Sequence, residues 1–140
     1  MTAVDETGDQ YRPTDDEPFM NGRQQEYFRR KLLNWKQEIM HEAKITLEAL
    51  QTTGEHQADI ADRASSETDR AIELRARDRQ RKLISKIDSA LERIAEGTYG
   101  YCEETGEPIS LKRLDARPIA TLSLEAQERH ERREKVYRDD

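Results

Sequence analysis

Residues 27–50 read YFRRKLLNWKQEIMHEAKITLEAL, and the spacing of their apolar side chains decides the fold. The apolar positions recur at steps of three or four residues, which places them on one face of a helix with near-heptad spacing. The opposite face is charged. The pattern therefore predicts a long amphipathic helix from about Gly22 to Leu50, with this apolar stripe: Phe28, Leu32, Trp35, Ile39, Ala43, Thr46 and Leu50.

A second stretch with helical periodicity follows a break of small polar residues that contains Gly54. We expect a helix from about Asp62 or Ser65 to Ala95 that stops at Gly97, because glycine is the usual residue just past a helix end. Two amphipathic helices joined by a short turn bury their stripes on each other as antiparallel neighbours. The second stripe consists of Ala64, Ala71, Ile72, Ala76, Leu83, Ile87, Ala90, Leu91 and Ile94.

Composition along the chain divides it into four parts. Residues 1–22 are polar and acidic and contain prolines, which is typical of a flexible arm. Residues 23–95 form the predicted coiled coil, with its tip near 53–64. Residues 96–122 have the outline of a zinc-finger loop, and 123–140 are expected to form a C-terminal helix. The predicted fold class is mainly α: a long antiparallel coiled-coil hairpin with a small zinc-finger-like globular part and a C-terminal helix.

The overall composition limits what such a chain can do. Of its 140 residues, 39% are charged and 34% hydrophobic, which suits solvent-flanked helices better than a large globular core. A net charge of −6 makes it a poor candidate for wrapping nucleic acid. No apolar run is long enough for a membrane span, the N-terminus does not resemble a secretory signal, and one cysteine cannot form an internal disulfide. We therefore expect a cytoplasmic protein, monomeric because its coiled coil is intramolecular.

The finger outline lies in YCEETGEPISLKRLDARPIATLSLEAQE, residues 101–128, and it lacks most zinc ligands. A structural zinc site takes four Cys or His ligands, usually as paired C-x₂-C elements. The corresponding positions here are Cys102, Thr105, Ser123 and Ala126. A thiolate, two hydroxyls and a methyl group cannot hold zinc with the affinity that folds a finger. We therefore expect no structural zinc.

Hydrogen bonds and apolar packing are expected to replace the metal. The Thr105 hydroxyl can bond the turn backbone, and Gly106 can take the positive φ that closes the loop. Ser123 stands where an N-cap of the last helix is expected. The expected packing uses Tyr99, Tyr101, Ile109, Leu111, Leu114, Ile119 and Leu122. The single thiol, Cys102, has two interpretations: a small buried hydrophobe, or a redox-active group if it is exposed and has a lowered pKa.

Two carboxylates mark the predicted tip. Asp59 and Asp62 are three residues apart, so at a helix start they face the same way. They can cap the second helix and interact with its dipole, contact a basic partner, or approach a bound Mg²⁺. The residues alone leave these alternatives open, although capping does not obviously need both.

Tip and finger outline together resemble the DksA/TraR family from about Gln25 to the C-terminus. ADIADRAS matches the family's tip pattern through Asp59, Asp62 and Ala64, and ELRARDRQRKLISKID matches its second coiled-coil helix. KRLDARPIA matches a characteristic run of its finger segment. The family's four zinc cysteines are reduced to one, so the chain resembles a cysteine-poor, zinc-independent variant.

The resemblance implies a non-enzymatic transcription regulator that binds bacterial RNA polymerase rather than a promoter sequence. Its coiled coil would enter the secondary channel, with the tip near the catalytic region, and destabilise open promoter complexes such as those at ribosomal RNA promoters. It also implies cooperation with guanosine tetraphosphate, ppGpp, in the stringent response. The matching effector positions are Lys86 and Arg117, whose charges suit phosphate. A third basic position of the family is Gln127 here, and Arg79 and Arg113 are further basic candidates.

Two other functions compete with this interpretation. The first is a transcript-cleavage factor in which tip carboxylates hold a second Mg²⁺ for phosphodiester hydrolysis. The second is an interaction protein that responds to oxidation of Cys102.

Overall fold

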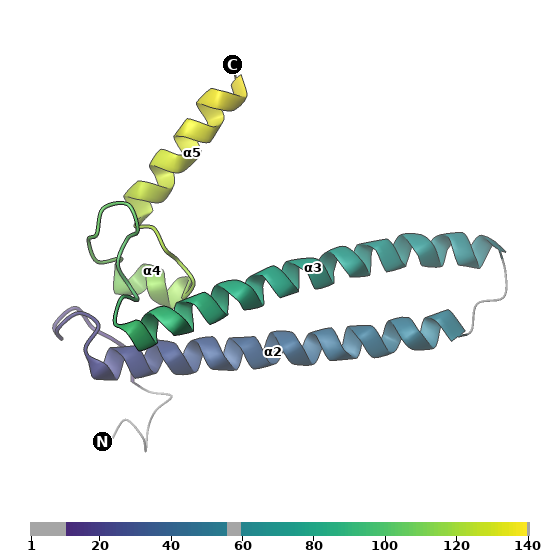
Figure 1. The fold of residues 1–140 in the computed structure, drawn as a ribbon, viewed down its shortest axis with the longest axis horizontal. Coiled ribbons are helices and arrows are strands. Elements are labelled where there is room, and N and C mark those ends of the chain that lie inside the picture. The colour runs from purple at the N-terminus through teal and green to yellow at the C-terminus, as the bar shows by residue number, and fades with distance from the viewer. Residues whose placement is uncertain (1–10, 56–59, 140) are drawn as a thin grey trace. The chain divides into compact units, whose positions relative to one another are not determined.

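The computed structural model describes residues 11–55 and 60–139, and its regular structure is helical (Figure 1). The two long helices pack as an antiparallel hairpin, so the predicted mainly α fold class is confirmed. No helix in these described ranges combines the length and apolarity that crossing a membrane requires. The helices are α2 (Gly22–Glu55), α3 (Ile60–Glu96), α4 (Leu111–Ala116) and α5 (Leu124–Asp139).

The long helices begin and end at slightly different residues than the sequence predicts. α2 continues past Leu50 to Glu55 and includes Gly54, while α3 begins at Ile60 rather than at Asp62. A single glycine costs a helix only about 1 kcal/mol, and extending an existing helix is far easier than starting one. Gly54 therefore does not end α2.

The chain divides into two compact units, and α2 and α3 contribute to both. Residues 33–88 form the hairpin unit; residues 1–32 and 89–140 form the head unit. In the hairpin unit, Ile39 and Ile87 are buried, and the Lys36 ammonium lies 2.7 Å from the Asp88 carboxylate on the neighbouring helix. These contacts fix the antiparallel pairing of the two helices within this unit.

Toward the tip, the apolar seam of the hairpin unit is thinner than predicted. Ala71 is exposed and Ile72 is 53% exposed, although both belong to the predicted stripe of α3. In the half of the hairpin unit nearer the tip, the apolar stripe of α2 consists of the small residues Ala43 and Thr46, which are only half-buried. Small side chains offer little apolar surface, so large neighbours stay partly in water.

Tyr99 lies at the centre of the head unit. Its side chain is 1% exposed, its ring centroid lies 5.6 Å from that of Phe28, and its hydroxyl donates to the Pro118 carbonyl at 2.7 Å. One residue thus joins α2, the end of α3 and the loop after α4. Most of the predicted packing set is buried with it, namely Ile109, Leu111 and Leu114.

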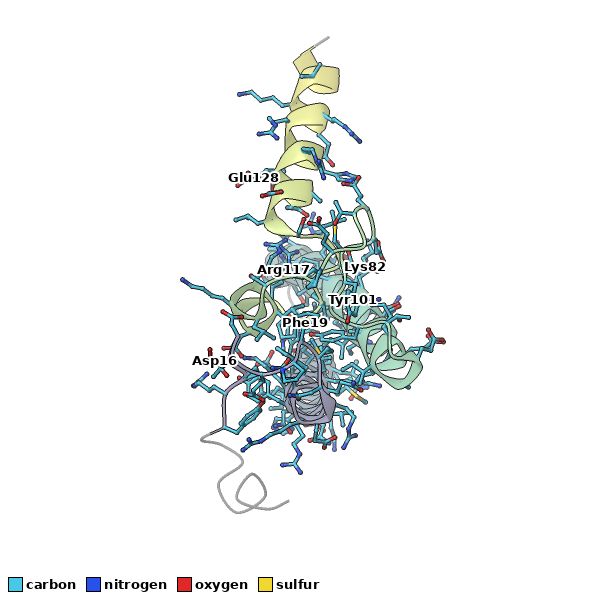
Figure 2. All side chains as sticks on the ribbon, turned by 90° about the vertical axis from the view of Figure 1, so that its left-hand side faces the viewer. Asp16, Phe19, Lys82, Tyr101, Arg117 and Glu128 are labelled. Atoms are coloured by element: carbon cyan, nitrogen blue, oxygen red, sulfur yellow. The ribbon has the colours of Figure 1, made fainter. Side chains whose placement is uncertain are left out.

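Tyr101 differs from this prediction because it is 40% exposed. It forms an isolated antiparallel bridge with Pro108, and its ring meets Phe19 edge-on with centroids 5.3 Å apart (Figure 2). Successive residues of an extended segment point to opposite sides, so the burial of Cys102 turns its neighbour Tyr101 outward.

Residues 11–21, which we call the strap, have no regular secondary structure and contact other residues of the head unit. The Tyr11 hydroxyl donates to Glu17 at 2.7 Å, and the Met20 N–H donates to the Gln24 side chain at 2.7 Å. Met20 has a positive φ of 55°, and Gln24 is fully buried. Flexibility of the segment 1–22 stays a prediction, and residues 1–10 lie outside the described part.

Gly100 is the tightest point between the strap and the finger-like loop. Its φ is +95°, and a Cβ there would lie 2.8 Å from Met20 Cε and 3.2 Å from Phe19 Cζ. Gly106 also has positive φ, +76°, but a Cβ there would meet nothing within 4 Å. An alanine at Gly106 therefore meets backbone strain alone, whereas an alanine at Gly100 meets backbone strain and a steric clash.

We expect Gly100→Ala to lower the free energy of unfolding more than Gly106→Ala does. Positive φ alone costs a non-glycine residue about 1–3 kcal/mol. The clash adds about 0.5–1.5 kcal/mol, because the end of the flexible Met20 side chain must shift. Urea denaturation followed by near-ultraviolet circular dichroism, which reports the tyrosines of the head unit, measures both variants. Equal destabilisation would show that the strap does not press on Gly100.

Candidate functional site

The finger-like loop is closed by backbone hydrogen bonds. The Cys102 N–H donates to the Glu107 carbonyl at 2.8 Å, and the Gly106 N–H donates back to the Cys102 carbonyl at 2.9 Å. A third bond, from the Glu103 N–H to the Thr121 carbonyl at 2.9 Å, ties the loop to the segment before α5. Backbone hydrogen bonds therefore join the two halves of the finger outline.

The residues at three of the four zinc-ligand positions form other contacts in the head unit. The Thr105 hydroxyl accepts from the Glu107 N–H at 3.2 Å, and the Ser123 hydroxyl accepts from the Ala126 N–H at 3.2 Å, as an N-cap of α5. Ala126 is fully buried. The predicted turn bond of Thr105 and the predicted N-cap role of Ser123 are both confirmed.

This donor set does not fit a structural zinc ion. Two of the four positions are hydroxyls already engaged with backbone N–H groups, and the buried methyl of Ala126 offers no lone pair. Within the ranges 11–55 and 60–139, no group of three or more His, Cys, Asp or Glu side chains is arranged to hold a metal. Structural zinc requires four such ligands.

Cys102 is 2% exposed and is surrounded by hydrogen-bond donors. Burial raises the pKa of its thiol, but donors aimed at the sulfur outweigh burial and lower the pKa to about 6. These donors are the N–H groups of Ser123, Thr105 and Glu104 and the Thr105 hydroxyl. A thiolate in this position is stabilised but shielded from reagents, so burial does not favour the redox interpretation.

Glu104 anchors the first turns of α5 to the loop. Its carboxylate lies 2.6 Å from His130 Nε2 and 3.9 Å from the Arg129 guanidinium. Together with the buried Ala126, these contacts hold the base of the helix. Beyond it, residues 131–136 of α5 are exposed.

The predicted tip residues lie at or beside the start of α3. Asp59 lies outside the described residues. Asp62 and Ala64 belong to the first turns of α3, which begins at Ile60.

The predicted effector residues are exposed cations. Lys86 lies on α3 in the hairpin unit. Arg117, which is labelled in Figure 2, follows α4 in the head unit. Gln127, at the third position, donates to Glu131 at 3.3 Å. Of the further candidates, Arg79 is exposed, whereas Arg113 donates from Nε to the Leu122 carbonyl at 2.9 Å and so has a structural role.

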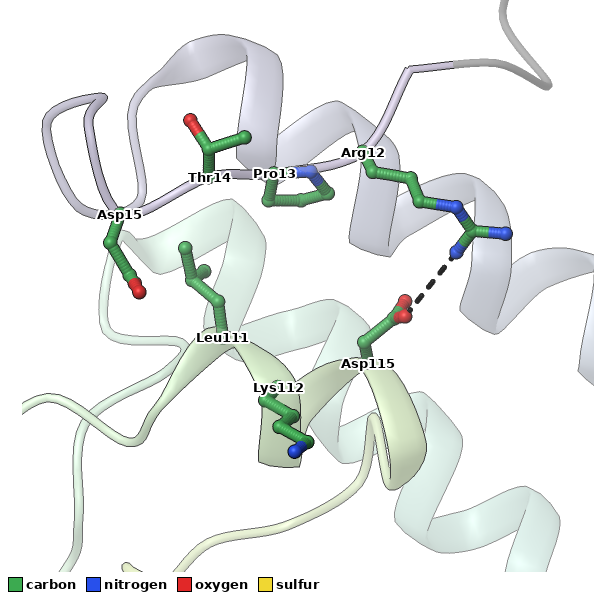
Figure 3. Close-up of a pocket in the computed structure, with 7 residues that line it drawn as sticks. All are labelled: Arg12, Pro13, Thr14, Asp15, Leu111, Lys112 and Asp115. Atoms are coloured by element: carbon green, nitrogen blue, oxygen red, sulfur yellow. Dashed lines mark ion pairs between the residues drawn. The ribbon is translucent and has the colours of Figure 1, made fainter.

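Sequence reasoning missed the ionic centre formed by Asp115. Its Oδ1 accepts from the Tyr27 hydroxyl at 2.5 Å and from Lys31 Nζ at 2.7 Å, and Arg12 lies 3.5 Å from its Oδ2 (Figure 3). Burial raises the pKa of Asp115, but the bonds from Lys31 and Tyr27 outweigh it and hold the pKa below its ordinary value. The sequence signal was only a lone acidic residue within KRLDARPIA.

Comparisons with known proteins agree with this architecture. The family model described as "DnaK suppressor protein DksA, N-terminal domain" matches residues 24–94. The model described as "Prokaryotic dksA/traR C4-type zinc finger" matches residues 97–132. The two matches together cover the long helices and the finger-like loop.

Individual relatives extend the match over nearly the whole chain. The RNA polymerase-binding transcription factor DksA of Caulobacter vibrioides is 71% identical over 130 residues, 93% of this chain and 92% of that protein. Its counterpart in Escherichia coli K12 is 38% identical over 125 residues, 89% and 83% of the two chains. The solved structure of DksA2 from Pseudomonas aeruginosa is 46% identical, covers 86% of this chain and 95% of its own, and superposes with a TM-score of 0.79.

These matches define the class as helical-hairpin transcription factors with a finger-like head, which are not enzymes. The chain belongs to the DksA family. The predicted family, the mainly α fold and the prediction of a non-enzymatic protein are thereby confirmed, and the transcript-cleavage alternative is set aside.

We expect the Cys102 thiol to ionise with a titration midpoint near pH 6, as its lowered pKa requires, rather than the ordinary midpoint of about 8.5. Thr105→Val removes a hydroxyl donor to the sulfur and should raise that midpoint. Thr121→Val, in the same region but outside the set of donors, should leave it unchanged. The ultraviolet absorbance of the thiolate, measured across pH, gives each midpoint without requiring a reagent to reach the buried sulfur. An ordinary midpoint in the wild type would contradict the hydrogen-bonded thiolate.

Proposed function

We propose that this chain is a cytoplasmic transcription regulator that binds bacterial RNA polymerase with its coiled coil in the secondary channel. It destabilises open promoter complexes, ribosomal RNA promoters among them, and acts with ppGpp in the stringent response. The observation that carries the proposal is membership of the DksA family, in which close relatives are named RNA polymerase-binding transcription factors. The acidic net charge of −6 agrees with a protein partner rather than a promoter sequence.

We assign to the tip residues the contact with RNA polymerase that destabilises open promoter complexes. Asp59, Asp62 and Ala64 match the family's tip pattern, and α3 starts at Ile60 beside them. A negative charge at the start of a helix is stabilised by the dipole and remains available to a basic partner. Capping is then a secondary role of these aspartates.

Lys86 and Arg117 are assigned to the ppGpp interface with polymerase. Both side chains are exposed, and Arg117 presents a planar guanidinium that suits bidentate phosphate contacts. Gln127 replaces a third cation, so the effector interface has one charge fewer than the family pattern. We therefore expect a weaker response to ppGpp than in relatives with all three cations.

Zinc independence is the second part of the proposal. The positions of the zinc ligands hold one thiol, two hydroxyls that accept backbone hydrogen bonds, and a buried methyl group. The loop closes through its own backbone bonds. Such a head keeps its fold when zinc is scarce, because no part of its folding free energy comes from metal binding.

The wild type should inhibit run-off transcription from a ribosomal RNA promoter, and ppGpp should deepen that inhibition. Asp62→Asn should abolish inhibition because the tip loses the charge that acts on the polymerase. Asp69→Asn, an exposed aspartate further along α3, is the matched control and should inhibit like the wild type. Transcript yield with purified bacterial RNA polymerase is the measurement. Full inhibition by Asp62→Asn would remove the tip from the mechanism.

A chelator should leave the melting temperature of the wild type unchanged. The control is the triple variant T105C, S123C, A126C, which restores four thiols and should gain stability from zinc that a chelator then removes. Thermal unfolding with and without chelator, combined with elemental analysis, measures both proteins. A chelator-induced drop in the wild type would overturn zinc independence.

A further inference from the structure

Arg117 combines an exposed side chain with a backbone that is held on both sides. Its N–H donates to the Arg113 carbonyl at 2.8 Å, which closes the last turn of α4. The residue after it, Pro118, is buried and accepts from the Tyr99 hydroxyl at 2.7 Å. In the described part of the chain, no side chain forms an ion pair with the Arg117 guanidinium. The result is a free cation on a constrained backbone.

α4 cannot supply this constraint by itself. It has six residues, and a helix of this length is not stable in isolation. Its start is held by the Ser110 hydroxyl, which accepts from the Arg113 N–H at 3.1 Å, and its apolar side buries Leu111 and Leu114. The end that carries Arg117 therefore depends on contacts made near Asp115.

We propose that Asp115, held by Tyr27, Lys31 and Arg12, is a positioning residue that fixes Arg117 for its contact with a polyphosphate. We call this four-residue cluster the Asp115 latch. The inference rests on the proposed function, because it assigns the latch to the ppGpp interface. Residues of the strap and of α2 thereby set the geometry of the phosphate contact. None of them needs to touch the effector.

The carboxylate of Asp115 carries two electrostatic penalties at its place in α4. A carboxylate in the last turn of a helix is disfavoured by the negative end of the dipole. The same carboxylate, two residues before a phosphate-binding arginine, would also repel the ligand. Both penalties are offset by Lys31 at 2.7 Å and Arg12 at 3.5 Å. The carboxylate therefore serves to attach the end of α4 to α2 and the strap.

The latch also spans the hollow between the strap and α4. This hollow has a volume of about 320 Å³, and Arg12 and Asp115 bridge it at one side (Figure 3). Within the latch, the Tyr27 ring is edge-on to Tyr11, with centroids 5.9 Å apart, and to Phe28, with centroids 5.1 Å apart. Removing the Tyr27 hydroxyl leaves these ring contacts in place, so Tyr27→Phe loosens the latch without unpacking the core.

Positioning and simple electrostatics predict opposite results for Asp115→Asn. Loss of a negative charge near Arg117 should by itself strengthen polyphosphate binding, whereas loss of the latch should weaken it. Tyr27→Phe changes no charge and should weaken it only through position. The matched control is Glu26→Gln, because the Glu26 side chain is 33% exposed, close to the 34% of Asp115, and also pairs with two cations within the head unit.

The experiment measures the ppGpp concentration for half-maximal inhibition of run-off transcription, together with inhibition in the absence of ppGpp. We expect Tyr27→Phe and Asp115→Asn to raise that concentration on the order of three- to tenfold, the effect of losing one oriented hydrogen bond. Inhibition without ppGpp should be unchanged, and Glu26→Gln should match the wild type. An unchanged or lower ppGpp requirement in both variants would overturn the inference.

Amide hydrogen exchange at Arg117 provides a readout that does not depend on the effector. Its N–H, bonded to the Arg113 carbonyl, should exchange faster in Tyr27→Phe and Asp115→Asn than in the wild type or Glu26→Gln. Unchanged exchange would show that the latch does not hold the end of α4 and would overturn the inference. If Arg117→Ala leaves a normal ppGpp response, the proposed effector site fails instead, and the role assigned to the latch falls with it.

Discussion

The buried side chain of Tyr99 is the contact on which the head unit depends. Its ring packs on Phe28 of α2, and its hydroxyl holds the Pro118 carbonyl in the loop after α4, so one side chain joins three segments that are distant in the sequence. Burial raises the pKa of this phenol well above its ordinary value, which keeps the hydroxyl protonated and able to donate. In a chain with 34% hydrophobic residues, few side chains can make such a junction, and each buried aromatic therefore carries a large share of the packing.

At three of the four positions that match the family's zinc ligands, the side chains of this chain form hydrogen bonds or packing contacts. Four zinc bonds fix the ends of two short segments; here backbone bonds around Cys102 and an N-cap at Ser123 fix the same ends. The remaining thiol still sits among N–H donors that favour a thiolate, and these donors lower its pKa. Donors of this kind stabilise a charge on sulfur whether or not a metal shares it. Retaining the thiol therefore costs little folding free energy, because the sulfur still accepts hydrogen bonds from these donors.

Local pattern allowed the long helices, the helix stop at Gly97, the N-cap at Ser123 and the positive φ of Gly106 to be predicted, because each depends on residues close in sequence. The Asp115 latch could not be found this way: Tyr27 and Asp115 are 88 positions apart, and nothing local distinguishes this carboxylate from a solvated one. Tip and effector residues came from the family resemblance rather than from their chemistry, since exposed charges on helices are common. The exposure of Ile72 was missed because periodicity gives the direction of a side chain but not the size of its neighbours.

The segment from Leu111 to Arg117, LKRLDAR, holds three cations and one carboxylate, and counted along the sequence the carboxylate only subtracts from the positive charge offered to a polyanion. In space, Lys31 and Arg12 lie against Asp115, so this carboxylate brings a cation from α2 and another from the strap to the same end of α4. Replacing Asp115 by a neutral residue would leave those two cations without a partner and α4 without its attachment. The net charge near Arg117 is thus set by tertiary contacts, and the carboxylate increases order there without making the surroundings acidic.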